Sequence, residues 1–83
     1  MKKIDIKVVE ILEDLCLTSI DDTSKTLIGD LAMDSLRMVM LLVTIEDSFD
    51  IELDESDMNP FDLITVNDVI SLVKKYVEDE EHA

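Results

Sequence analysis

The sequence Met33-Asp34-Ser35-Leu36 places a hydroxyl where a segment without regular periodicity gives way to a strongly apolar helix. Asp34 is a favourable N-cap residue, because its carboxylate can accept hydrogen bonds from the free N–H groups of the first helical turn. Ser35 then stands at or next to the first helical residue, with its hydroxyl facing solvent. An anionic group esterified to that hydroxyl would lie at the positive end of the helix dipole, where phosphates bind well.

Catalysis by the chain's own side chains is not indicated. A nucleophilic serine needs a nearby base and a group that orients the base. The only histidine, His82, lies in the C-terminal tail without a predicted partner, so we expect no Ser-His-Asp hydrolase and no enzyme. Cys16 is the only cysteine, which rules out a disulfide within the chain, and its apolar helical position favours a small buried hydrophobe over a reactive thiol.

A metal site is not expected either. The acidic stretch at 50–59 has aspartates spaced as in calcium-binding loops. An EF-hand loop also needs a central glycine and a bidentate glutamate at its end, and this stretch has neither. We predict loose binding of divalent ions by surface carboxylates, and an acidic ion buffer stays open as an alternative function.

Hydrophobic periodicity predicts an all-α fold. We expect a helix from about Lys3 to Cys16, a second helix opening at Ser35 and a last helix opening at Thr65, where Asp68 completes an approximate capping box. A short helical turn is expected at 54–57, and a long loop joins the first two main helices. The prediction is one domain at 1–83, a bundle of three main helices plus one short helix, with a frayed tail at 77–83.

The core of this bundle can be assigned from spacing. In the long loop, Gly29 indicates a tight backbone, and four apolar residues are expected to tuck under the bundle: Ile20, Leu27, Ile28 and Leu31. The segment before the last helix should pack against the second helix through Pro60, Phe61, Leu63 and Ile64. The helical core positions are Ile4, Val8, Ile11, Leu12 and Leu15, then Met38, Leu41, Leu42, Ile45 and Phe49, then Val66, Val69, Ile70, Val73, Tyr76 and Val77.

The second helix is apolar on two sides. Its core face leaves a further apolar set on the other side, formed by Leu36, Val39, Met40 and Val43. Such a helix is either wholly buried or presents one face to a partner. Composition alone leaves both readings open.

The formal net charge is −14, from 21 acidic and 7 basic side chains. Nucleic acid and anionic membranes are therefore not expected partners, since both require Lys and Arg. A protein partner should present a basic patch. No apolar run approaches the ~20 residues of a membrane span and no signal peptide is evident, so we expect a cytoplasmic monomer.

At Asp34-Ser35-Leu36 the chain resembles the acyl carrier protein family, with further similarity at Gly29-Asp30-Leu31, at 45–51 and at 65–69. The resemblance implies that Ser35 carries a covalent 4′-phosphopantetheine, with Asp34 and Leu36 completing the motif. It implies a carrier of acyl groups as thioesters in fatty-acid, polyketide or related synthesis. The expected partners are a phosphopantetheinyl transferase and acyl-transferring or condensing enzymes with basic or apolar docking patches, which would read Leu36, Arg37, Val39, Met40, Val43, Glu46 and Asp47.

The sequence departs from fatty-acid carriers at several positions. Those carriers usually place acidic side chains where this chain has Arg37 and Met40, and commonly read Gly-Ala where it has Ala32-Met33. These departures favour a stand-alone carrier of a specialised polyketide, lipopeptide or aminoacyl pathway. Two alternatives stay open: an aminoacyl or peptidyl carrier of a nonribosomal or D-alanyl system, and an unmodified acidic helical interaction module.

Overall fold

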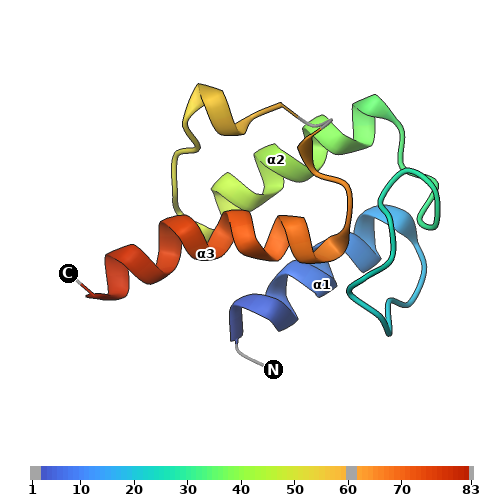
Figure 1. Cartoon of the computed structure of the whole chain (residues 1–83), viewed down its shortest axis with the longest axis horizontal. Helices are drawn as coiled ribbons and strands as arrows, with labels where there is room; N and C mark the ends of the chain where they lie inside the picture. Colours follow the sequence, from blue (N-terminus) through green and yellow to red (C-terminus); the bar gives the residue numbers. More distant parts are fainter. Residues whose placement is uncertain (1–2, 60–61, 83) are drawn as a thin grey trace.

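The computed structural model describes residues 3–59 and 62–82, the side chains of 78–82 excepted. Along the chain it has α1 (Lys3–Cys16), α2 (Ser35–Phe49), the 3-10 helix η1 (Glu55–Asp57) and α3 (Val66–His82). Helix α1 packs against both α2 and α3 (Figure 1). Apart from one isolated β-bridge, the described residues contain no extended pairing. The prediction of an all-α bundle with three main helices and one short helix is confirmed.

The core follows the helical periodicity closely. Every predicted core position of α1, α2 and α3 is buried or packs against the buried cluster, and Met33 and Met38 are both fully enclosed. Leu53, Leu63 and Leu72 complete the cluster. Phe61, expected in the core together with Pro60, lies outside the described residues. The α3 backbone continues to His82, and fraying of the tail stays a prediction.

For two residues the prediction of a core position is wrong. Ile28 is 52% exposed and Ile64 is 60% exposed. Ile28 lies in a helix-like turn in which Leu27 and Leu31, four residues apart, share the inward face and Ile28 does not. Ile64 follows buried Leu63 in a non-helical segment, where successive side chains point to opposite sides.

The long loop at 17–34 is attached to the start of α3 by backbone hydrogen bonds. The Leu27 N–H donates to the Ile64 carbonyl at 2.8 Å, and the Val66 N–H donates to the Lys25 carbonyl at 3.1 Å. The Asn67 N–H donates to the Thr23 carbonyl at 2.9 Å. The loop therefore follows a fixed path across the bundle and leads into the first turn of α2 (Figure 1).

Gly29 confirms the predicted tight backbone. Thr26 and Asp30 bond reciprocally: the Thr26 N–H donates to the Asp30 carboxylate at 2.9 Å, and the Asp30 N–H donates to the Thr26 hydroxyl at 3.0 Å. A Cβ at position 29 would lie 2.7 Å from that hydroxyl oxygen. Only glycine fits this turn without displacing Thr26.

The predicted capping box opens α3. The Asp68 N–H donates to the Thr65 hydroxyl at 3.3 Å, and the Asp68 carboxylate accepts from the N–H groups of Thr65 at 3.0 Å and Ile64 at 2.9 Å. These hydrogen bonds, that from Thr65 first, hold the pKa of Asp68 below its usual value. The charged form of Asp68 therefore stabilises the fold.

Asp68→Asn is expected to lower the free energy of unfolding by about 1 kcal/mol at neutral pH. Because the folded-state pKa of Asp68 lies below the unfolded value, its contribution is present above about pH 4 and is lost as the pH falls through the folded-state pKa. Urea titrations should therefore show a wild-type advantage that shrinks below about pH 4. Asp62→Asn, an exposed charge-matched control, should show little difference, and a pH-independent gap for Asp68→Asn would contradict this role.

Helix η1 is held against α3 by a small polar network. The Tyr76 hydroxyl donates to the Asp57 carboxylate and accepts from the Asp54 N–H at 2.9 Å. The Lys75 ammonium pairs with the same Asp57 carboxylate at 2.9 Å. The bond from Tyr76, followed by that from Lys75, lowers the pKa of Asp57. The acidic turn predicted at 54–57 is thus fixed by α3.

Candidate functional site

Asp34 caps α2 as predicted. Its backbone is extended, and its carboxylate Oδ1 accepts from the Arg37 N–H at 2.8 Å. The Asp34 carbonyl accepts the first helical bond, from the Met38 N–H at 3.0 Å. The cap fixes the point at which the helix begins and makes Ser35 its first residue.

Ser35 is exposed, and polar groups beside it are free. Asp34 takes the Arg37 N–H, whereas in the described part of the chain the N–H groups of Ser35 and Leu36 have no protein acceptor. Together with the helix dipole they favour an anion at this end of α2. A hydroxyl that can be esterified therefore stands beside donors suited to a phosphate.

The segment that precedes Ser35 is held in place because buried and exposed side chains alternate along it. Leu31 and Met33 point into the core, and the Met33 N–H donates to the Leu27 carbonyl at 3.0 Å. Ala32 lies between them, exposed and in the left-handed region with φ of 55°. An alanine in that region is strained, because its Cβ lies too close to the following carbonyl oxygen, a contact that glycine avoids.

Ala32→Gly should therefore stabilise the fold, by about 0.5–1 kcal/mol after the entropic cost of glycine in the unfolded chain. Denaturant unfolding would measure the gain. Ala32→Ser keeps a Cβ and serves as the matched control, which should show no gain. A loss of stability in Ala32→Gly would mean that this backbone conformation carries no strain.

Helix α2 presents an apolar face to solvent. The sequence allowed either whole burial of this helix or an exposed apolar face, and the structure shows the second. Leu36 is 67% exposed, Val39 49%, Met40 46% and Val43 53%, so whole burial is excluded. Arg37 is also exposed, 3.9 Å from the Asp34 carboxylate. The face begins at the residue next to Ser35.

The two acidic residues predicted beside this face differ. Asp47 is exposed. Glu46 is partly buried, and its Oε2 accepts from the Leu53 N–H at 3.0 Å, which ties the chain after α2 to the helix. Glu46 therefore has a structural task that its spacing did not reveal.

Leu17 was not predicted as a residue of this site. It follows α1 in the left-handed conformation with φ of 55° and is 87% exposed. Leu17 lines a groove with Leu36, Arg37 and Met40, and Asp34, which precedes Ser35 in the chain, also lines it. The available signal was an apolar residue directly after the last helical position, where glycine is usual.

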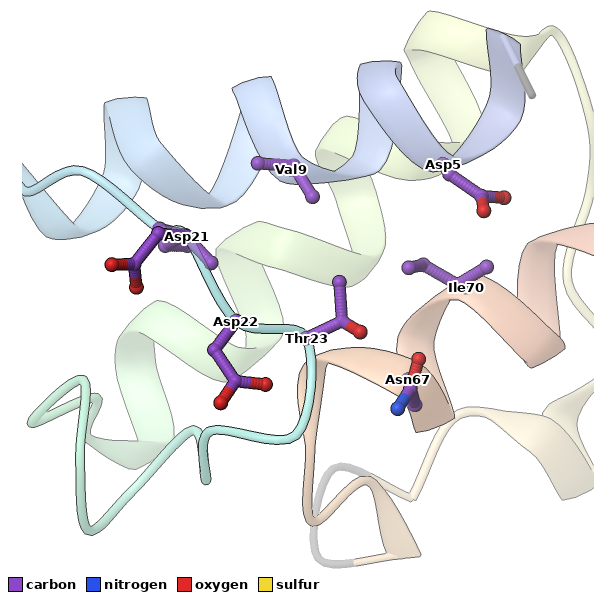
Figure 2. Close-up of a pocket in the computed structure, with 8 residues that line it drawn as sticks. Asp5, Val9, Asp21, Asp22, Thr23, Asn67 and Ile70 are labelled. Atoms are coloured by element: carbon purple, nitrogen blue, oxygen red, sulfur yellow. The ribbon is translucent and has the colours of Figure 1, made fainter. Parts of the chain in front are cut away.

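A second hollow, of about 350 Å³, lies between α1, the loop and α3 (Figure 2), and Ser35 does not line it. Asp5, Asp21 and Asp22 contribute to it, but Figure 2 shows their carboxylates spread apart. Asp5 pairs with Lys74 at 3.4 Å. Among the residues whose side chains the structure describes, 3–59 and 62–77, no group of three or more His, Cys, Asp or Glu residues could hold a metal ion.

Comparison with known proteins agrees with this geometry. The family model described as "Phosphopantetheine attachment site" matches residues 7–73. A curated acyl carrier protein of Desulforapulum autotrophicum is 37% identical over 75 residues, covering 87% of this chain and 95% of that protein. The chain belongs to the acyl carrier protein family. Membership implies a covalently attached 4′-phosphopantetheine.

The acyl carrier fold fits that group at the start of α2. An exposed hydroxyl and two free N–H groups stand where a phosphodiester would be formed. Acyl carrier proteins act as carriers that interact with a phosphopantetheinyl transferase and with biosynthetic enzymes. None of the helices in the described part of this acyl carrier protein has both the length and the apolar character needed to cross a membrane.

Proposed function

We propose that this chain carries acyl groups as thioesters on a 4′-phosphopantetheine arm attached to Ser35, and delivers them to biosynthetic enzymes. The observation that carries the proposal is the exposed Ser35 at the first position of α2, preceded by the Asp34 cap and followed by Leu36. The residues matched by the phosphopantetheine family model include this position.

Attachment would use chemistry supplied by a separate transferase. The Ser35 Oγ forms a bond to the phosphorus next to pantetheine in coenzyme A, the anhydride P–O bond breaks to release adenosine 3′,5′-bisphosphate, and the serine proton passes to a base of the transferase. The protein contributes position: the helix dipole and the free N–H groups of Ser35 and Leu36 favour the anionic phosphodiester. The arm supplies a thiol for thioester formation, while catalysis takes place in the partner enzymes.

The docking surface is proposed to comprise Leu36, Arg37, Val39, Met40, Val43, Glu46 and Asp47. Its apolar side chains are 46% to 67% exposed, and the chain as a whole carries a net charge of −14. A partner with an apolar docking patch flanked by basic groups matches both properties. Within this surface, Glu46 can offer a partner the carboxylate oxygen that does not accept from Leu53. We place the protein in the cytoplasm, as a monomer of one domain.

Arg37 and Met40 favour a specialised pathway, because they make the docking surface less acidic than in fatty-acid carriers. Acyl cargo is favoured by Met33-Asp34, where peptidyl carriers more often have Gly-Gly-His or Gly-Gly-Asp. An aminoacyl or peptidyl carrier is the second candidate.

The test is the intact mass of the chain after incubation with coenzyme A and a broad-specificity phosphopantetheinyl transferase. We expect a gain of one phosphopantetheine. No gain with several transferases would instead support an unmodified interaction module. A saturable site in a calcium titration would support an ion buffer.

A further inference from the structure

The methionines of this chain differ in their exposure to solvent. Met33 and Met38 are 2% and 1% exposed, and Met58 is partly buried against the core. Met40 is 46% exposed on the outer face of α2. Met1 lies outside the described residues. Within the part of the chain whose side chains are described, Met40 is therefore the methionine most open to a reagent from solvent.

Met40 lies in the middle of the exposed apolar face of α2. Leu36 stands four residues before it and Val43 three residues after it, so both are its neighbours on the same side of the helix. Met40 also lines the groove of about 460 Å³ that Leu17 and Leu36 border, which gives small molecules a second route to its side chain. A chemical change at Met40 therefore alters the proposed docking surface itself.

Oxidation turns the thioether of methionine into a polar group. A hydroperoxide such as hydrogen peroxide supplies the oxygen: the Sδ lone pair forms the S–O bond, the O–O bond breaks, and the second oxygen leaves as water. The sulfur is oxidised and the peroxide is reduced. The sulfoxide oxygen is a hydrogen-bond acceptor, and its burial against an apolar surface without a donor is unfavourable.

We propose that Met40 is a reversible oxidation site, and that its sulfoxide switches off docking at the apolar face of α2. The inference rests on the proposed docking surface and on loading at Ser35. The thioether fits an apolar partner patch, whereas the sulfoxide brings an unpaired polar group into the same contact. Thiol-dependent methionine sulfoxide reductases remove the oxygen as water and restore the thioether. The carrier thus stops docking under oxidising conditions and resumes after reduction.

The position of Met40 lets this modification act on docking without unfolding the protein. Met40 lies outside the buried cluster, so an added oxygen at its sulfur stays in solvent in the free protein. Met38, two residues away, belongs to that cluster. An oxygen on Met38 would have to enter a close-packed core, which would destabilise the fold.

The first experiment maps the oxidised residue, with Met38 as the internal control. The apo-protein with Cys16→Ala, which removes the only thiol, is treated briefly with hydrogen peroxide. Cleavage after Arg37 and Glu46 releases peptide 38–46, in which Met38 and Met40 are the only methionines. We expect Met40 to react at least about tenfold faster than Met38, since Met38 reacts only when the fold opens locally. In concentrated urea the two rates should be equal.

The second experiment measures the KM of the transferase for this apo-protein after the peroxide has been removed. The Met40 sulfoxide should raise the KM about tenfold, and treatment with a methionine sulfoxide reductase should reverse the rise. Met40→Leu cannot form the sulfoxide, so peroxide should leave that variant's own KM unchanged. Met58→Leu, the matched control, should respond to peroxide as its parent does.

Three results would overturn the inference while loading of the untreated protein leaves the proposed function intact. They are oxidation of Met40 no faster than that of Met38, an unchanged KM for the sulfoxide, and an equal rise of the KM in Met40→Leu. A loss of helical circular dichroism on oxidation would assign the rise to unfolding and would overturn it too. No loading of the untreated protein would overturn the proposed function and this inference with it.

Discussion

Ser35→Ala is expected to abolish the gain of phosphopantetheine completely, because no other serine stands at the first position of a described helix beside free N–H groups. Its effect on the free energy of unfolding should stay within about 0.5 kcal/mol, since Ser35 is exposed and Asp34 makes the capping bond. Intact mass spectrometry and urea unfolding measure the two quantities.

Ser71→Ala is the matched control for this variant. Ser71 is also exposed and helical, but it lies in the interior of α3. It should be loaded like the wild type. Loading of Ser35→Ala at the wild-type level would refute the assignment, and a large loss of stability in that variant would make Ser35 a structural residue.

Leu36→Ala is expected to raise the KM of the transferase for the apo-protein about tenfold, which corresponds to about 1.4 kcal/mol of binding. Leu36 is the most exposed apolar side chain of α2 and directly follows Ser35, the proposed attachment residue. An alanine there removes apolar area available to a partner and suits a helix.

Ile6→Ala is the control for the loss of exposed apolar area. Ile6 is 45% exposed on α1 and does not belong to the proposed docking surface. The KM of the transferase for the Ile6→Ala protein should stay at the wild-type value. An equal rise of the KM in both variants would place docking elsewhere. An unchanged KM in both variants would show that the transferase does not use the apolar face of α2.

Hydrophobic spacing was sufficient to locate the helices. The bounds Lys3–Cys16 and the opening of α2 at Ser35 could be predicted because apolar repeats and the Asp34 cap are local signals. Ile28 and Ile64 could not be placed correctly, since their exposure depends on how the loop pairs with the segment before α3. That pairing joins residues far apart in the sequence.

The site shows the same division. The Asp34 cap, the position of Ser35 and the second apolar face of α2 follow from a capping residue and a helical period. The bond from Leu53 to Glu46 and the position of Leu17 beside Met40 depend on tertiary contacts, which a local pattern does not encode. Spacing alone also left whole burial of α2 open, and only packing against α1 and the loop shows which face is free.

The central claim is that Ser35 itself carries the arm, and peptide mapping of the loaded protein tests it most directly. Cleavage after Lys25 and Arg37 releases the peptide 26–37, in which Ser35 is the only serine. We predict that fragmentation places the whole phosphopantetheine mass on Ser35 of that peptide. The modification on Thr26, or in any other peptide, would contradict the account.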